Sequence, residues 1–371
     1  MIPTMTVKMA LVLLLLCLVF VHFTFPSTRL RYFSSNETEG SWTDSLTRCR
    51  QNNESPVTLY DEEDGMFTMK FIYGKSVWLG LRKVRNITWS DGSPVTFNKS
   101  SVDVTNGTQR CQAIENNTWK DYDCSTLKYF MCEPVLGTNI TNYTLVEINK
   151  TWCQAREYCR YKHYDLVSIS NDVQNDQVIE KGNNRSFWIG LMHDEWEWED
   201  KGCSSFRKWI GPKQCCCAIQ SNYGLDPKMR RHDCLHFVCL FCSRGHVRIK
   251  VIPIESTWEQ AFDYCKAKHT RLLWIESVED QKAVVQWLNY TQGGDRRFWI
   301  GLRQSRVFGF WIWANERMVG YSNWKNNTQP ELPLSNHCGV ITPSDNYTWS
   351  DENCLFPLHF LCEEEIYFMN N

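Results

Sequence analysis

Three stretches of the chain carry the same amphipathic pattern, in which a tryptophan is followed by a small residue and then by a cysteine. The residues are Trp42, Ser45 and Cys49, then Trp152, Ala155 and Cys159, and finally Trp258, Ala261 and Cys265. The spacing i, i+3, i+7 puts three positions on one side of an α-helix. Each stretch is therefore predicted to be a helix that buries this side and ties its cysteine to a strand.

Each predicted helix is followed by an apolar run, Trp-Leu-Gly-Leu or Trp-Ile-Gly-Leu, and then by a long stretch of short β-like runs. The apolar runs begin at Trp78, Trp188 and Trp299. Two cysteines with seven residues between them end each copy: Cys124 and Cys132, Cys234 and Cys242, Cys354 and Cys362. The copies recur about every 110 residues, which is the size of a domain and too long for a solenoid unit.

This recurrence predicts three tandem α+β domains, each with two early helices, antiparallel strands, a long irregular loop and disulfide staples. We place the domains at residues 31–133, 143–243 and 248–364, joined by short linkers. Long loops on a rigid scaffold often carry function, so the loop after each apolar run is the first place to look for a site.

The composition indicates an oxidising compartment, because 18 cysteines in 371 residues favour disulfides. Residues 1–28 contain Lys8 and then the apolar run 9–25, as in a signal peptide. If this run is an uncleaved anchor instead, the chain is a type II membrane protein. Dense N-x-S/T sequons add the expectation of a secreted glycoprotein. They begin at Asn36, Asn53, Asn86, Asn98, Asn106, Asn116, Asn139, Asn142, Asn149, Asn184, Asn289, Asn326 and Asn346.

The remaining composition argues against two functional classes. A net charge of −2 gives no reason to expect binding to nucleic acid. No common nucleophile, zinc-protease or phosphate-loop motif occurs in the sequence. The cluster His232-Asp233-Cys234 contains catalytic residue types, but Cys234 is expected in a disulfide and so has no thiolate to offer. We therefore expect no enzymatic activity.

The tryptophan–cysteine helix, Trp-Ile-Gly-Leu, Trp-x-Trp, a late Trp-x-Asp and four cysteines together resemble the C-type lectin-like domain, three times over. Three tandem copies are similar to the macrophage mannose receptor-like lectins. The resemblance implies that the first cysteine of each copy pairs with the fourth and the second with the third. The implied bridges are Cys49–Cys132, Cys111–Cys124, Cys159–Cys242, Cys217–Cys234, Cys265–Cys362 and Cys338–Cys354.

In lectins of this family a calcium ion joins the protein to two sugar hydroxyls, and calcium needs six to eight oxygen ligands. The first copy has Lys120 inside its Trp-x-Asp motif, and an ammonium group has no lone pair for calcium. The second copy has Arg230 and Arg231 at this position. With Lys228 they form either a basic patch for acidic ligands or, as we favour, a solvated loop.

The third copy alone keeps candidate calcium ligands in its long loop. The candidates are Gln329, Glu331, Asn336 and Asp351, of which Gln329, Glu331 and Asp351 would also contact the sugar. Two features count against the site. Ser350 stands where the family has an asparagine, and Asn326 begins a sequon inside the loop. Calcium is therefore an expectation for the third copy only, beside the alternative of a calcium-independent or vestigial loop.

The second copy contains nine cysteines, five more than the fold needs. Without Cys17 of the signal peptide the total of 18 becomes 17, and an odd number favours an intermolecular bridge or one free thiol. A disulfide-linked homodimer through the second copy is one expectation. A metal site at Cys239, Cys242, His232 and His236 is a weaker alternative, because the fold already uses Cys242.

Two binding functions follow from the resemblance. The first is a secreted or cell-surface lectin of innate type that binds glycans or glycoproteins, with weak calcium dependence through the third copy. The second is a receptor or adaptor that binds proteins without calcium and keeps only vestigial sugar sites.

Overall fold

The computed structural model describes residues 28–84, 89–100, 109–134, 143–161, 164–210, 216–220, 227–291, 296–305 and 307–369. The predicted signal peptide up to residue 27, Cys215, and the sequon residues Asn86, Asn106, Asn139 and Asn142 lie outside these ranges. The chain divides into two compact units. The first holds the third repeat, and the second holds Phe33–Ser243 with the short segments Trp287–Gly294 and Glu364–Asn371.

The third repeat closes on itself around one sheet. The sheet has the order β15-β21-β17-β19-β20, with β16 beside β21 and β18 beside β17. Its predicted first helix is confirmed, because α6 buries Trp258, Ala261 and Cys265. The elements are β15 (Val247–Ser256), α6 (Trp258–Lys268), β16 (Arg271–Leu272), α7 (Val278–Thr291), β17 (Phe298–Gln304), β18 (Trp311–Trp313), η2 (Lys325–Asn327), β19 (His337–Thr342), η3 (Pro343–Asp345), β20 (Thr348–Asn353) and β21 (Leu358–Glu365).

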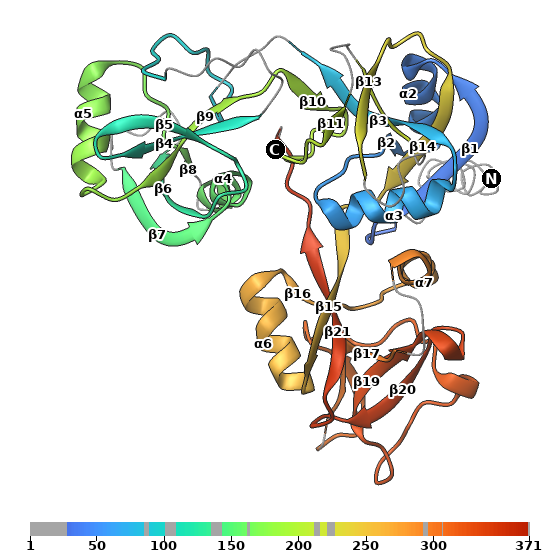
Figure 1. Cartoon of the computed structure of the whole chain (residues 1–371). Helices are drawn as coiled ribbons and strands as arrows, with labels where there is room; N and C mark the ends of the chain where they lie inside the picture. Colours follow the sequence, from blue (N-terminus) through green and yellow to red (C-terminus); the bar gives the residue numbers. More distant parts are fainter. Residues whose placement is uncertain are drawn as a thin grey trace, which may run out of the picture. The chain divides into compact units, whose positions relative to one another are not determined.

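The first and second repeats exchange halves and form two lobes (Figure 1). Lobe A joins the first half of repeat one to the second half of repeat two. Its elements are β1 (Tyr32–Gly40), α2 (Trp42–Gln51), β2 (Ser55–Pro56), α3 (Glu62–Ile72), β3 (Ser76–Lys83), β10 (Trp196–Trp198), β11 (Trp209–Ile210), β12 (Cys216–Gln220), β13 (Met229–His232) and β14 (Val238–Arg244).

Lobe B joins the second half of repeat one to the first half of repeat two. Its elements are β4 (Arg110–Glu115), β5 (Thr118–Tyr122), β6 (Lys128–Pro134), β7 (Thr144–Lys150), α4 (Trp152–Tyr161), β8 (Tyr164–Leu166), α5 (Asp172–Lys181) and β9 (Phe187–His193). Lobe B is thus one continuous stretch of chain, inserted between β3 and β10 of lobe A.

All three sheets share one strand order despite the exchange. Lobe A has β1-β14-β3-β12-β13, lobe B has β7-β6-β9-β4-β5, and the third repeat has β15-β21-β17-β19-β20. The central neighbours are parallel in each case, β14 with β3, β6 with β9 and β21 with β17. Each lobe is therefore a complete copy of the same fold.

The helix tryptophans explain why the sequence pattern is so constant. Each one begins its helix and donates its indole N–H to a carbonyl inside the apolar run, so that helix and strand are joined. The pairs are Trp42 with Leu79 at 2.9 Å, Trp152 with Ile189 at 2.8 Å, and Trp258 with Ile300 at 2.9 Å. A buried indole that found no acceptor would cost free energy, so this bond fixes the position of each helix.

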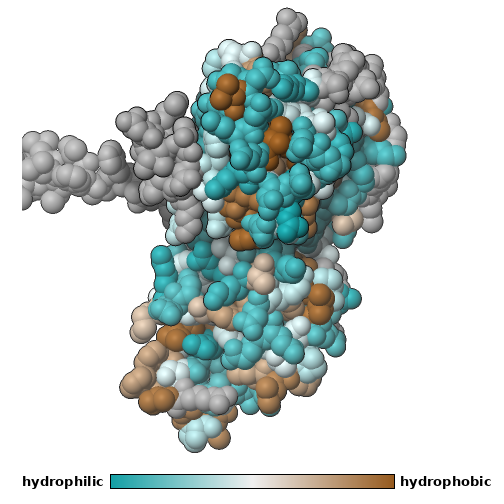
Figure 2. All heavy atoms as spheres, turned by 90° about the vertical axis from the view of Figure 1, so that its left-hand side faces the viewer, coloured by the Kyte–Doolittle hydropathy of each residue, from teal (hydrophilic) through white to brown (hydrophobic). Residues whose placement is uncertain are grey.

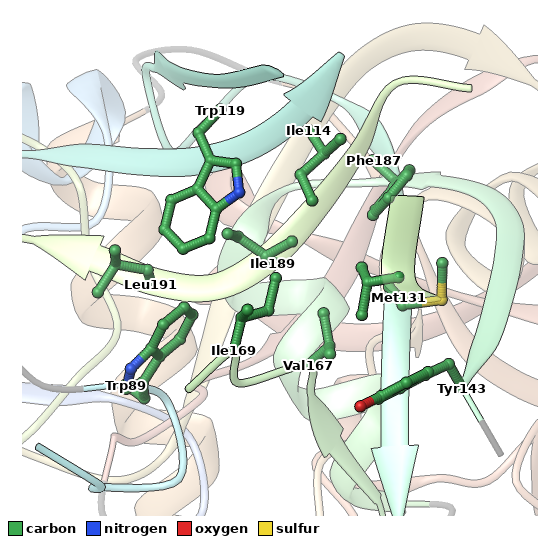
Figure 3. Packing of buried hydrophobic residues seen from close by; sticks show 11 residues of the cluster. Trp89, Ile114, Trp119, Met131, Tyr143, Val167, Ile169, Phe187, Ile189 and Leu191 are labelled. Carbon is green, nitrogen blue, oxygen red and sulfur yellow. The ribbon is translucent and has the colours of Figure 1, made fainter. Parts of the chain in front are cut away.

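The hydrophobic core of lobe B shows directly that two repeats contribute to it (Figure 3). Ile114, Trp119 and Met131 come from the first repeat, and they pack in one cluster with residues of the second repeat such as Ile169 and Phe187. The indole of Trp119 donates to the amide oxygen of Asn175 on α5 at 2.8 Å. The exchange is therefore built into the packing as well as into the strand order.

The disulfides correct three of the six implied bridges. The structure joins Cys49 to Cys242 and Cys132 to Cys159, so the implied pairs Cys49–Cys132 and Cys159–Cys242 are wrong. Cys216 rather than Cys217 bonds Cys234. The three remaining implied bridges, Cys111–Cys124, Cys265–Cys362 and Cys338–Cys354, are confirmed, and a further bridge joins Cys153 to Cys203.

Both kinds of error have a physical reason. Equivalent halves place their cysteines at equivalent positions. Each bridge therefore joins two cysteines of the same lobe, even though they come from different repeats. In lobe A the Cα atoms of Cys49 and Cys242 are 5.7 Å apart, within the range of a disulfide. Neighbouring residues of a strand point to opposite faces, so only one of Cys216 and Cys217 can reach Cys234.

The order of the strands gives a reason for the exchange itself. β6 and β7 are consecutive in the chain and pair antiparallel, with Phe130 opposite Val146 and Met131 opposite Leu145. Only residues 135–143 separate the two strands. Consecutive strands usually pair, because a short connection costs little loop-closure entropy. In lobe B this hairpin replaces the longer-range pairing that a self-contained first repeat would need.

Glu133 at the end of β6 is a carboxyl group whose charge the fold disfavours. It accepts the backbone N–H of Ser168 at 2.9 Å. Burial, and then the carboxylates of Asp91 and Asp165, raise its pKa to about 7. Burial also raises the pKa of its counterpart in the third repeat, Glu363, but there an ion pair with Arg29 at 2.8 Å opposes the rise.

Replacing Glu133 by glutamine should stabilise lobe B at neutral pH. The folded pKa of Glu133 lies above its unfolded value, so the wild-type chain loses stability as pH rises from about 4.5 to 7. A difference of 2.5 pKa units corresponds to about 3 kcal/mol, which partial exposure reduces to about 1–2 kcal/mol. Urea unfolding at pH 4 and pH 8 measures the difference in the free energy of unfolding between Glu133→Gln and wild type. This difference should appear only at pH 8. Glu363→Gln is the matched control and should destabilise, because it removes one member of an ion pair.

Candidate functional site

The long loop of the third repeat lies between β18 and β19 and is held by buried tryptophans. Trp324 contacts Trp311 with ring centroids 4.8 Å apart and Trp349 with centroids 5.9 Å apart. Trp349 donates its backbone N–H to Asn323 at 2.8 Å and its indole N–H to Gln281 of α7 at 3.0 Å. The base of the loop is therefore fixed by the core.

A second anchor holds the far part of this loop. The indole of Trp311 donates to the carbonyl of Pro330 at 2.8 Å. The side-chain amide of Gln304, at the end of β17, donates to the carbonyls of Gly309 at 2.7 Å and Pro330 at 3.4 Å. The hydroxyl of Ser335 donates to the same Gln304 side chain. Gln304 thus joins two loops, residues 305–310 and residues 329–336.

The structure brings two of the four predicted calcium ligands together. Asn336 and Asp351 meet, because the Asp351 carboxylate accepts the backbone N–H of Asn336 at 2.6 Å. Gln329 and Glu331 are exposed on the loop. The backbone carbonyl of Glu331 accepts the N–H groups of Leu334 at 3.2 Å and Ser335 at 3.1 Å in a tight turn.

This arrangement does not fit a calcium ion of the family type. Calcium needs six to eight converging oxygens, and the four residues bring two carboxylates, one of which already accepts a backbone N–H. Within the described ranges there is also no group of three His, Cys, Asp or Glu side chains placed to hold a metal.

The equivalent positions of the two lobes carry ion pairs and stacked cations. In lobe B, Lys120 pairs with Glu115 at 3.1 Å and Asp121 pairs with Arg110 at 3.7 Å. Hydrogen bonds from Ser186, Tyr122 and Lys120 lower the pKa of Glu115 to about 2. In lobe A, Arg231 is buried with its guanidinium 4.3 Å from the ring centroid of Trp209. Arg231 therefore belongs to the packing of the lobe, and the expected solvated loop does not describe it.

The third repeat instead presents a cluster of exposed apolar side chains, which we call the loop patch. These residues were not predicted from the sequence, although apolar side chains in loops that contain Gly and Pro could have indicated an exposed patch. The exposed fractions are 81% for Val307, 76% for Phe308, 41% for Phe310, 40% for Leu332 and 90% for Leu334.

Two contacts connect three members of the loop patch, Phe308, Phe310 and Leu332. The rings of Phe308 and Phe310 stack with centroids 5.7 Å apart. Gly309 between them has a φ of +75° and lies against Leu332, whose Cδ1 would be 3.4 Å from an added Cβ. In Figure 2 the lower part of the molecule, which holds the third repeat, shows hydrophobic surface near its lower edge.

The family model of the Lectin C-type domain matches the chain three times, at residues 38–134, 148–242 and 254–364. The chain belongs to the C-type lectin domain family. This lectin-like chain is 21% identical to the secretory phospholipase A2 receptor of Mus musculus over 92% of its own length and 27% of the receptor. It is 25% identical to the C-type mannose receptor 2 of Homo sapiens over 44% of the chain and 11% of the receptor. The chain thus spans about a quarter or less of these receptors.

Smaller relatives of the lectin-like chain match single repeats. Perlucin of Haliotis laevigata is 28% identical over 30% of the chain and 72% of perlucin. Among solved structures, human lithostathine aligns with 32% of the chain and 90% of lithostathine, at 21% identity and a TM-score of 0.30. A calcium-independent type II antifreeze protein aligns with 33% of the chain and 89% of that protein, at 25% identity and a TM-score of 0.29.

The surplus cysteines of the lectin-like chain are partly explained. Cys153 and Cys203 are bonded to each other, and Cys217 and Cys239 are free, with Cys217 buried and Cys239 partly exposed. Burial raises the pKa of both thiols. Cys242 is bonded to Cys49, so it cannot be the thiolate ligand of the metal site that was the weaker alternative. The nine described sequon asparagines are exposed.

Proposed function

We propose that this chain is a secreted recognition protein whose third repeat binds a protein or glycoprotein ligand without calcium. The observation that carries the proposal is the loop patch, which occupies the part of the fold where converging oxygen ligands were predicted. Exposed apolar clusters with polar surroundings are typical of protein-binding surfaces. A sugar ligand would require hydrogen-bonding groups that converge. Gln329 and Glu331 are exposed on the loop, and the Asp351 carboxylate already accepts the backbone N–H of Asn336.

The same proposal includes secretion, glycosylation, a predicted dimer and the lack of catalytic activity. Seven disulfides among the described residues support secretion into an oxidising compartment. The exposed sequons support glycosylation. No described helix is long and apolar enough to cross a membrane. A disulfide-linked homodimer through the second repeat stays a prediction, and among the cysteines that the structure describes Cys239 is the partly exposed free thiol that would form it. We propose no catalytic activity, because the two large relatives that match the chain are named as receptors.

Calcium binding through Gln329, Glu331, Asn336 and Asp351, with carbohydrate as the ligand, is the second candidate. Thermal unfolding of the full chain in EDTA and in 10 mM calcium separates the two. A site with a Kd of about 0.1 mM would add about 2.7 kcal/mol, which is several degrees in Tm. We expect a shift below one degree, in wild type and in Glu331→Ala alike. A shift of several degrees that Glu331→Ala removes would establish the calcium site and refute our proposal.

Binding of the labelled chain to fixed animal cells in EDTA tests the ligand class. Periodate destroys vicinal diols of glycans, and trypsin removes surface proteins. We expect binding to survive periodate, to disappear after trypsin, and to fall at least tenfold in the Phe308→Asp/Leu334→Asp variant. Val173→Asp, at an exposed residue of lobe B, is the matched control and should bind as wild type does. Loss of binding after periodate alone would favour the carbohydrate candidate.

A further inference from the structure

The segment Ile366–Met369 lies against residues 201–203 as an added strand. The backbone N–H of Cys203 donates to Tyr367 at 2.7 Å, and the N–H of Met369 donates to Lys201 at 2.7 Å. The pairing is antiparallel, with Gly202 opposite Phe368. Both hydrogen bonds join main-chain atoms, as in proteins that bind a peptide by strand addition.

Arg156 of α4 binds the same segment through its side chain. Its side chain is 1% exposed, and its guanidinium donates to the carbonyl of Phe368 at 2.9 Å and to the carbonyl of Met369. Its Nε has no hydrogen-bond partner among the described residues. Burial lowers the pKa of Arg156 to about 10. A buried guanidinium is usually paired with a carboxylate, and here the hydrogen bonds go to carbonyl groups of the segment.

The groove that holds the segment is built from both lobes of the exchanged pair. Arg156 belongs to lobe B, and residues 201–203 follow β10 in lobe A. The disulfide Cys153–Cys203 joins the same two walls one helical turn from Arg156. Met369 lies at the wall of a cavity of about 580 Å³ that is also lined by Gln109, whose Oε1 is buried without a partner. The groove therefore continues beyond the four residues that fill it.

We propose that this groove is a binding site for an extended peptide strand, and that residues 366–369 fill it as an internal ligand which a partner's strand can displace. The chemistry of the occupant follows from the segment itself. Two main-chain hydrogen bonds fix the strand, Arg156 requires two successive carbonyls, and the side chains of Ile366, Tyr367 and Phe368 indicate an apolar and aromatic sequence. This site is independent of the loop patch and of the ligand proposed for the third repeat.

An internal ligand controls access through its effective concentration. A segment tethered by a short connection competes at about millimolar effective concentration. A free peptide of the same sequence must therefore bind the full chain much more weakly than a chain that lacks the segment. The binding-competent state is the one with the segment released, and the apparent affinity scales with the population of that state.

The test uses a labelled peptide of residues 364–371 and fluorescence polarisation. We expect the peptide to bind a chain truncated after Glu365 at least tenfold more tightly than it binds the full chain. In the truncated chain, Arg156→Gln should weaken binding at least tenfold. Arg185→Gln, at an exposed arginine of lobe B, should not change it. A folded truncated chain that binds the peptide no better than the full chain would overturn the proposal.

A variant of the full chain keeps the proposal testable if truncation impairs folding. Met369→Pro removes the N–H that donates to Lys201, whereas Met369→Ala keeps it and removes only the side chain. We expect peptide binding to rise in Met369→Pro well above Met369→Ala. Equal binding in the two variants means that main-chain pairing does not hold the segment, and this result would also overturn the proposal.

Discussion

Replacing Cys49 and Cys242 together by serine is expected to leave the number of free thiols unchanged, whereas replacing Cys49 and Cys132 together is expected to add two. The reason is that Cys49 is bonded to Cys242 and Cys132 to Cys159. Two repeats that each closed on themselves would give the opposite result. Thiol counting under denaturing, non-reducing conditions, by alkylation and mass measurement, decides between the two arrangements.

The same double variant should also lower stability by a large amount. The Cys49–Cys242 bridge spans 193 residues, and removal of a native disulfide costs about 2–5 kcal/mol. The loss should be confined to lobe A, because the bridge Cys132–Cys159 of lobe B is intact. Hydrogen exchange should therefore accelerate at amides of β3, β12 and β14 and stay slow in β4, β6 and β9. Acceleration spread equally over both lobes would contradict the exchanged fold.

Arg207→Met is expected to destabilise the chain by about 3–5 kcal/mol at pH 7, because it leaves a buried carboxylate without its cation. Arg207 and Asp194 form an ion pair of 2.8 Å in which each side chain is 5% exposed. Burial raises the pKa of Asp194, and the arginine opposes that rise. Without Arg207 the pKa of Asp194 should rise further, so the loss should shrink as pH falls and the carboxyl takes up a proton.

The double variant Arg207→Met/Asp194→Asn completes this test. Removing the charge of Asp194 as well should recover much of the lost stability and abolish its pH dependence. Arg185→Met is the matched surface control, since Arg185 and Glu147 are each more than half exposed, and such pairs contribute about 0–1 kcal/mol. Urea unfolding at several pH values gives the free energy of unfolding of wild type and of the three variants. A pH-independent loss in Arg207→Met would show that lost packing, and not an unpaired charge, causes the destabilisation.

The local structure could be predicted from the sequence, because each helix carries its own periodic signal. The buried faces of α2, α4 and α6 are those of the tryptophan, small-residue and cysteine pattern. The partners of each half could not be predicted. The halves of the first two repeats are chemically equivalent at their contacts, so the pattern that identifies Cys49 and Cys159 as first cysteines cannot say which fourth cysteine each will meet.

The exposed position of the long loop in the third repeat could be predicted, but the contacts that shape this loop could not. The loop after β18 does lie at an anchored, exposed position, as long loops on rigid scaffolds often do. Gln329 and Glu331 were predicted as calcium ligands because they place oxygen-bearing side chains on either side of Pro330. The conformation of this loop depends on the hydrogen bonds from Trp311 and Gln304 to Pro330, and these join residues about 20 positions apart or more. Spacing along the chain carries no information about such contacts.

The insertion of lobe B between β3 and β10 also sets an order of folding during synthesis. Residues 32–83 leave the ribosome first, but the strands that complete their sheet begin only at Trp196. At about 5–20 residues per second, the second half of lobe A begins to be translated roughly 6–23 seconds after β3 is complete. Lobe B needs only its own continuous stretch and can fold within this interval. Of the two lobes, the one whose translation begins first is therefore finished last, and Cys49 can form its native bridge only after Cys242 has been translated.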